Sequence, residues 1–209
     1  MMEPRLAEAF RRLQVDLRAL RIQWALVGGL AVSARAEPRT TRDIDVAIAV
    51  VGDNEAEEVI RRLRDRGYLD EVVMEHRDVG RLSTVRLTRR GDESGIFYDL
   101  LFASSGIEPE VVERADLLEI LPGLYAPVAT TAHLLALKVL ALRPNRPQER
   151  PQDFTDIREL FRVADEDDLR MARSALELIA SRGYDRRKDL EIEFETQLRQ
   201  FQQGQHYNG

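Results

Sequence analysis

Two glycines and two aspartates in one short segment are the first residues of this chain whose spacing suggests chemistry. The segment "LVGGLAVSARAEPRTTRDIDVAIAV" covers residues 26–50 and contains Gly28, Gly29, Asp43 and Asp45. Alternate residues of a strand share a face, so the two carboxylates point the same way at the start of an apolar run. Like charges at that spacing raise each other's pKa unless a cation neutralises them, and Mg²⁺ prefers such oxygen ligands.

The glycine pair separates the apolar run "IQWALV" from a brief predicted helix, "LAVSARA". Because glycine lacks a Cβ, backbone N–H groups at Gly28 and Gly29 can approach an anion at the positive end of that helix. The alternative is a strand-to-helix turn that needs glycine only for its backbone angles. Asp43 and Asp45 have a similar alternative, as solvated acids offset by Arg42. Together, a phosphate-binding turn and a carboxylate pair would hold a nucleoside triphosphate and its metal.

The elements that must position these residues follow from hydrophobic periodicity and turn signals. Strands are predicted for "DIDVAIAV", "EVVMEH", "RLSTVRLTR" and "GIFYDLLFA", and helices for residues 3–21, for "EAEEVIRRLRDRG" with Asp53 or Asn54 as its cap, and for four segments after Thr130. Residues 104–128 stay undecided, and the final "QQGQHYNG" is expected to be a loose tail. We therefore predict an α/β (α+β) protein: a mixed sheet flanked by helices in residues 1–128, followed by a helical region, 129–209, packed on that core.

Composition narrows the class of protein. The chain of 209 residues is 44% hydrophobic and 33% charged, which is typical of a globular protein. It has no cysteine, which excludes disulfides and thiolate metal sites. A net charge of -6 argues against a dedicated nucleic-acid binder, although an enzyme that touches RNA transiently remains compatible. No segment has the pattern of a secretion signal or membrane span, so we expect a cytoplasmic protein without a membrane partner.

The run "VGG", thirteen residues and then "DIDV" resembles the signature of the nucleotidyltransferase superfamily typified by DNA polymerase β. The approach "RTTRDID" is most similar to the AbiEii/AbiGii toxin-type nucleotidyltransferases. The resemblance implies a third carboxylate on a later strand, and "GIFYDLLFA" supplies Asp99. It further implies that Asp43 and Asp45 bind one or two Mg²⁺ ions. Asp99 would share the second ion and help to deprotonate an acceptor hydroxyl.

Lys138 lies among apolar neighbours in "HLLALKVLAL" and is one of only two lysines, so its ammonium must snorkel to the surface or find a partner. AbiEii-type proteins resemble this stretch in having a helix lysine, a nearby arginine (here Arg143) and a D-x-x-D helix. That helix would carry Asp153 and Asp156, which share a helical face. The resemblance implies that Lys138 holds the triphosphate and that one aspartate orients it. The sequence does not rank the two aspartates.

The arginines that precede the aspartate pair are ambiguous. Arg39 and Arg42 either steer a nucleotide or RNA, or simply offset the local acids. We assign Arg42 to the predicted nucleotide-binding set, which comprises Gly28, Gly29, Arg42, Lys138 and Asp153. The loop "RPNRPQER" is a candidate acceptor-binding loop, and His133 is expected to be a packed helix residue.

The predicted function is Mg²⁺-dependent transfer of a nucleoside monophosphate from an NTP to a hydroxyl of tRNA or protein. The catalytic set would be Asp43, Asp45, Asp99, Lys138 and Asp156. The resemblance suggests a toxin with a cognate antitoxin, and an antibiotic adenylyltransferase is a variant of the same class. Two competing classes are an inert binding module that keeps the fold, and a helical interaction protein whose D-x-D is incidental.

Overall fold

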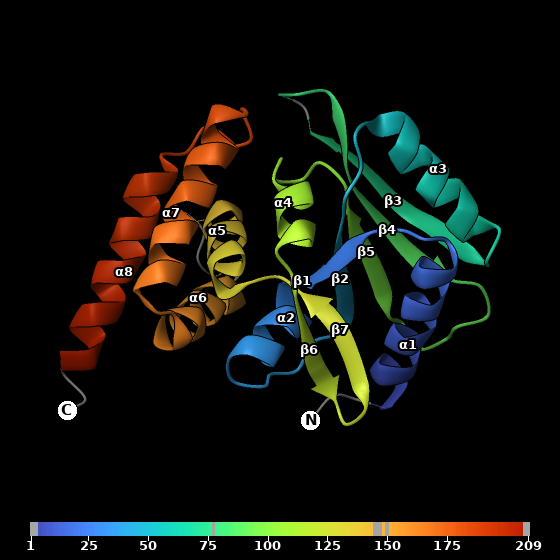
Figure 1. Cartoon of the computed structure of the whole chain (residues 1–209), viewed down its shortest axis with the longest axis horizontal. Helices are drawn as coiled ribbons and strands as arrows, with labels where there is room; N and C mark the ends of the chain where they lie inside the picture. The colour runs from blue at the N-terminus through green and yellow to red at the C-terminus, as the bar shows by residue number, and fades with distance from the viewer. Residues whose placement is uncertain (1–3, 77, 144–147, 149–150, 207–209) are drawn as a thin grey trace.

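The computed structural model describes residues 4–76, 78–143, 148 and 151–206. The strands are β1 (Trp24–Val27), β2 (Asp43–Ile48), β3 (Tyr68–His76), β4 (Arg81–Arg89), β5 (Phe97–Leu101), β6 (Asp116–Leu121) and β7 (Leu124–Val128). The helices are α1 (Pro4–Ala19), α2 (Gly28–Arg35), α3 (Asp53–Arg64), α4 (Glu108–Glu113), α5 (Thr131–Ala141), α6 (Pro151–Val163), α7 (Glu166–Ser181) and α8 (Leu190–His206). Figure 1 shows α5–α8 gathered on one side of the sheet, with α1 and α3 on the other.

The seven strands form one mixed sheet in the order β3-β4-β5-β2-β1-β7-β6. Strand β2 pairs parallel with β5 and antiparallel with β1, and β1 pairs parallel with β7. The predicted α/β fold with a mixed sheet is therefore confirmed. The central position of β2 places the aspartate pair between β5 and β1, where residues of neighbouring strands can lie beside it.

The alternation along β2 explains why its aspartates share one face. Ile44, Val46 and Ile48 are fully buried in the main hydrophobic core, and each such side chain contributes about 1.5–3 kcal/mol to folding. Asp43 and Asp45 point to the opposite face and are half-buried. The apolar residues therefore orient the strand, and the carboxylates follow from its period of two.

The predicted cap of α3 was wrong. The helix begins at Asp53, its N-cap is Gly52, and no side chain caps it. The Asp53 carboxylate instead accepts hydrogen bonds from Arg81 Nε at 2.6 Å and from the Leu82 N–H at 3.2 Å. Asp53 therefore bonds to residues of β4 and does not cap α3, as the sequence had suggested it would.

Two segments are more ordered than the sequence indicated. Residues 104–128 form α4 and the β6–β7 hairpin, whose edge strand leaves Leu117 70% exposed and so lacks a clear apolar pattern. The expected loose tail is helical as far as His206, since α8 continues through it. Phe201, next to that tail, packs 5.7 Å from the Phe161 ring, and this contact explains the longer helix.

The last strand ends at Val128 and the next regular element, α5, is a helix capped by Thr130, whose side chain accepts the His133 N–H. His133 is buried, as predicted for a packed helix residue, and burial lowers its pKa to about 4. Helix α2 contacts both α5 and α6, so the strands and the later helices meet around it. The division at residue 128 stays a prediction. None of the described helices combines the length and apolar character of a membrane span.

Candidate functional site

Three carboxylates lie together on strands β2 and β5. The parallel register places Asp45 directly opposite Asp99, and Asp43 opposite Phe97. The pKa of Asp45 is raised to about 7, mainly by burial and also by the negative charges of Asp99 and Asp43. Neighbouring strands are about 4.8 Å apart, which accounts for this mutual repulsion. The positive side chains near Asp45 therefore do not fully offset the negative charge of the three carboxylates.

Arg86 is the cation nearest to this group of carboxylates. Its Nε and Nη2 donate to the two oxygens of Asp99 at 2.8 and 2.6 Å, and Nη2 lies 3.6 Å from Asp43. Asp43 has a raised pKa, mainly because of burial, while Arg86 lowers it and Asp99 raises it. The sequence analysis missed Arg86. Its place between Val85 and Leu87 indicates a polar face of β4, but only the β4–β5 register puts Asp99 opposite it.

The glycine pair packs against the Asp45 carboxylate. Gly28 begins α2 with φ +62°, and a Cβ there would collide with that carboxylate. The Gly29 N–H donates to Asp45 and lowers its pKa. A Cβ on Gly29 would lie 2.7 Å from Arg39 Nη2. The turn therefore brings its backbone close to a carboxylate of the protein, and the predicted contact with a phosphate stays a prediction.

Lys138 and the D-x-x-D helix form a second network beside the carboxylates. Lys138 Nζ lies 2.8 Å from Asp153 and 2.7 Å from Asp156. Arg39 Nε is 2.7 Å from Asp156, which also accepts a hydrogen bond from Gln152 Nε2 at 3.2 Å. The Asp156 side chain is 1% exposed. Asp156 therefore joins α5 and α6 to the segment that leads into β2, a distinction from Asp153 that the sequence did not make.

The two networks adjoin each other. The charge of Lys138 lowers the pKa of Asp45, so its ammonium acts on the carboxylate group from α5. Residues 28, 29, 43, 45, 99 and 138 thus converge on one region, and their roles stay predictions. Arg42 is exposed, whereas Arg39 holds the buried Asp156. The loop "RPNRPQER" lies outside the described residues, apart from Arg143 and Gln148.

The donor chemistry of the carboxylate group suits Mg²⁺. All its ligands would be carboxylate oxygens, and a cation beside Asp45 would reverse the rise in its pKa. Within the part of the chain that the structure describes, no three ligand side chains already stand in a metal-binding arrangement. Arg86 pairs with Asp99 and Asp43, so a metal that binds all three carboxylates would have to displace that guanidinium.

Comparisons with known proteins identify the family and the fold. The family described as "Nucleotidyl transferase AbiEii toxin, Type IV TA system" matches residues 11–208. An antigenic nucleotidyltransferase-like protein from Paracoccidioides brasiliensis is similar in structure, with a TM-score of 0.52, 19% identity, and coverage of 91% of this chain and 92% of that one. That similarity shows the nucleotidyltransferase fold.

Two further structures are similar at lower scores. The lincosamide antibiotic adenylyltransferase LnuA has a TM-score of 0.46 and 18% identity, and the match covers 76% of this chain and 97% of that one. JHP933 from Helicobacter pylori has a TM-score of 0.43 and 11% identity, with coverage of 99% and 97%. No curated protein matches the chain.

Proposed function

The chain belongs to the AbiEii toxin family of nucleotidyltransferases, and from that premise we propose that it moves a nucleoside monophosphate from a Mg²⁺-bound NTP to a hydroxyl of tRNA or protein. The family makes the protein a transferase; the metal, the acceptor and the residue roles are our proposal. The observation that carries it is the pairing of Asp45 with Asp99, with Lys138 acting on Asp45 from α5.

Asp43, Asp45 and Asp99 would hold the Mg²⁺, which would neutralise charge on the triphosphate. Lys138 would contact the phosphates with its ammonium. Its present partners, Asp153 and Asp156, keep that ammonium at the edge of the carboxylate group. Asp156 is the better positioning residue of the two, because Arg39 holds it from the segment before β2. The contact with Arg39 supports Asp156 as the proposed positioning residue.

In the proposed reaction the acceptor oxygen forms a bond to the α-phosphorus, and the bond from that phosphorus to the bridging oxygen of pyrophosphate breaks. The hydroxyl proton passes to Asp99, and pyrophosphate leaves. Catalysis would come mostly from positioning and charge neutralisation, as expected for phosphoryl-type transfer. Arg86, freed from Asp99, would remain close enough to contact a phosphate or the acceptor.

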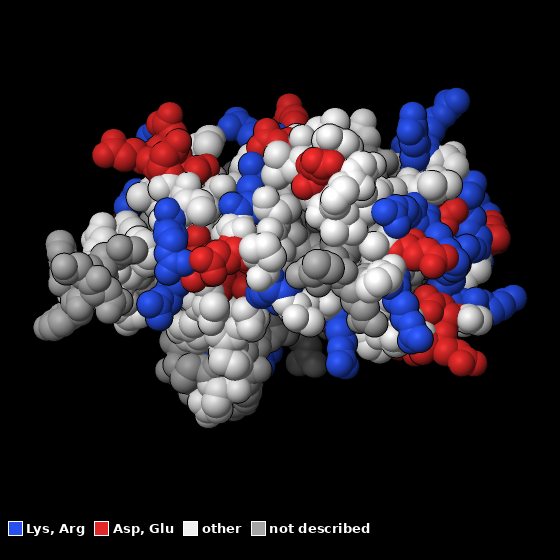
Figure 2. Space-filling view, turned by 90° about the horizontal axis from the view of Figure 1, so that it is seen from below, with Lys and Arg blue, Asp and Glu red and all other residues white. Residues whose placement is uncertain are grey.

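The acceptor is proposed to bind transiently. The chain carries a net charge of -6, and on the face in Figure 2 Lys and Arg side chains are interspersed with Asp and Glu. Mixed charges favour brief contact with tRNA over the tight, salt-sensitive binding of a dedicated nucleic-acid protein. A cognate antitoxin is proposed as a further partner, in keeping with the toxin–antitoxin description of the family.

The test is label transfer from each of the four α-labelled NTPs with Mg²⁺, using total tRNA and a protein extract as separate acceptors. We expect label on one acceptor class, and its loss in Asp45→Asn. Asp167→Asn is the matched control, because Asp167 is an exposed residue of α7 that pairs with Arg170. NTP binding without transfer to either acceptor would favour the inert binding module. An additional reaction with lincomycin tests the antibiotic-modifying alternative.

A further inference from the structure

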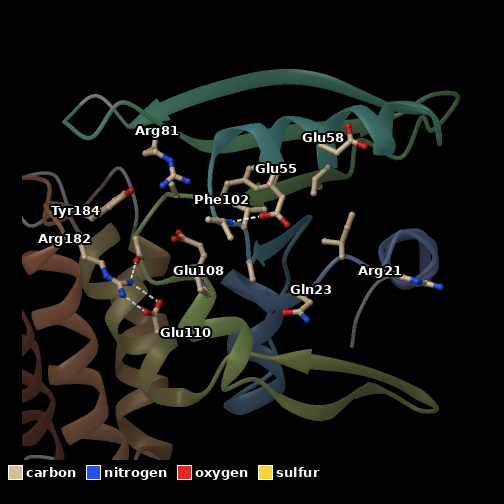
Figure 3. A pocket seen from close by; sticks show the side chains of 18 of the residues that line it. Arg21, Gln23, Glu55, Glu58, Arg81, Phe102, Glu108, Glu110, Arg182 and Tyr184 are labelled. Carbon is tan, nitrogen blue, oxygen red and sulfur yellow. Dashed lines mark hydrogen bonds and ion pairs between the residues drawn. The ribbon is translucent and has the colours of Figure 1, made fainter.

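A cavity of about 990 Å³ lies at the other end of strands β2 and β5. Its wall includes residues 49–51 after β2, Phe102 after β5, side chains of α3 and α4, and the turn that follows α7. Figure 3 shows these side chains arranged around the opening. Ala49, in the wall of the cavity, lies four positions beyond Asp45, or roughly 13 Å along the extended chain. The cavity is therefore separate from the carboxylate group, and its volume suits a small-molecule ligand.

Glu108, the first residue of α4, is the one buried acid in the described wall of this cavity, and it is 1% exposed. Its Oε1 accepts three hydrogen bonds, from Ser104 N at 2.9 Å, Ser105 N at 2.8 Å and Ser105 Oγ at 2.9 Å. Among the described residues, nothing donates to Oε2. Leaving a buried polar atom unpaired costs about 1–3 kcal/mol, so the structure keeps an unmet acceptor here.

Several other charged groups of the wall already have partners. Arg81 donates to Asp53 at 2.6 Å, and Arg182 pairs with Glu110 at 2.6 Å. The lining contains four arginines (21, 62, 81 and 182) and four glutamates (55, 58, 108 and 110), so its formal charges cancel. In Figure 3 the Glu108 carboxyl points toward the region between Arg81 and Tyr184. The wall thus carries no net formal charge, and the unpaired oxygen of Glu108 belongs to its one buried acid among the described residues.

The wall around Glu108 is preformed by contacts between distant segments. Gly106 has φ +74°, and a Cβ there would lie 2.5 Å from the Tyr184 ring. Arg182 Nη1 also donates to the Gly106 carbonyl. Apolar surface lies alongside, where Val51 is 95% exposed at the rim. A fixed polar position beside an apolar rim is the usual make-up of a small-molecule site.

We propose that this cavity is a second ligand site, which takes a small uncharged molecule that presents an N–H or O–H donor to Glu108 Oε2 from a partly apolar body. A ligand anion would meet the carboxylate of Glu108 unfavourably. A cation would have to give up its hydration in a wall whose formal charges already cancel, with Glu108 as the only buried counter-charge of the described wall. The ligand would contact α4 and the turn after α7 together, and so join the sheet to the later helices.

The test uses three probes with one ring and different charge: benzamide, benzoate and benzylamine. Each is titrated at pH 8, which favours the ionised carboxylate, and binding is followed by NMR shifts of the Ser105 and Gly106 amides. We expect saturable shifts with benzamide and weaker binding of the two charged probes. Tighter binding of benzoate or benzylamine than of benzamide would overturn the proposal. This comparison needs no substitution, so it is independent of variant folding.

Glu108→Gln sharpens the test. The three donors on Oε1 would hold the glutamine carbonyl oxygen, which turns the NH₂ group toward the cavity and removes the acceptor. Benzamide affinity should fall at least about tenfold. Glu58→Gln is the matched control, because Glu58 lines the same cavity but is already paired with Arg61. Unchanged benzamide binding in Glu108→Gln would also sink the proposal, whatever the outcome of the transfer assay.

Discussion

The two ends of strands β2 and β5 differ in how their buried acids are stabilised. At one end Asp43, Asp45 and Asp99 repel one another, and part of that charge is met by a guanidinium and an ammonium. At the other end Glu108 stands alone, and one of its oxygens is held by a serine turn. Clustered carboxylates need a mobile cation, whereas a solitary one can be stabilised by fixed N–H donors. The first arrangement suits metal-assisted nucleotidyl transfer, and the second suits the binding of a small ligand.

The largest expected effect is a difference in transfer activity between variants at the two ends of strands β2 and β5. Asp45→Asn should reduce nucleotide transfer by about 10²–10³-fold or more, because it removes charge where the metal-bound triphosphate would sit. Glu108→Gln should leave the rate unchanged, since it lies at the far end of the strands. Initial rates with labelled NTP measure both. Equal losses in the two variants would mean that the ends are not functionally distinct.

The second prediction concerns stability and pH. The pKa of Asp45 is about 7 in the folded chain and 3.8 when unperturbed, so folding favours its protonated form. The associated stability is present below pH 4 and is lost as the pH rises through 7. Asp45→Asn should therefore match the original protein at pH 4 and exceed its free energy of unfolding by about 2–4 kcal/mol at pH 8.

Urea unfolding at both pH values measures this difference. Adding Mg²⁺ with an NTP at pH 8 should narrow it, because the metal would stabilise the ionised carboxylate. A gap that is the same at pH 4 and pH 8 would contradict the assignment of the raised pKa to Asp45.

The third prediction isolates the contact between the glycine turn and Asp45. Gly28→Ala should lower the free energy of unfolding by about 2–3 kcal/mol, because a Cβ is strained at φ +62° and collides with the carboxylate. Gly123→Ala is the matched control: its φ is +74°, but a Cβ there meets no atom within 4 Å. Equal losses in chemical denaturation would show that backbone angle alone requires Gly28.

The smallest expected effect concerns Arg86. Arg86→Met should tighten Mg²⁺ binding without NTP by about tenfold, because it removes a positive charge and frees Asp99 and Asp43. Arg64→Met removes a comparable pairing, with Asp70, outside the carboxylate group and serves as the control. Isothermal titration calorimetry reports both affinities. Weaker metal binding in Arg86→Met would show that the guanidinium orients the carboxylates rather than competing with the metal.

Local patterns were sufficient to predict several parts of the candidate site. The alternation of apolar residues in β2 put Asp43 and Asp45 on one face, and the apolar flanks of Asp99 identified its strand. Helical spacing likewise placed Asp153 and Asp156 on one side of α6. These predictions depend on residues within a few positions of each other, where the periods of strand and helix hold. The β6–β7 hairpin was not predicted, because its exposed edge strand lacks a regular alternation of apolar residues.

Local sequence patterns determined strands β2 to β5, most of the helices, and the acids that these elements carry. Only the tertiary structure decided that Arg86 pairs with Asp99 and that Arg39 rather than Arg42 holds Asp156. It also decided that one oxygen of Glu108 is buried without a hydrogen-bond partner among the described residues. The physical reason is that each of these facts depends on strand register or on packing between segments far apart in the chain. Local propensity carries no information about such partners, because strand register and the packing of the core determine which distant residues meet.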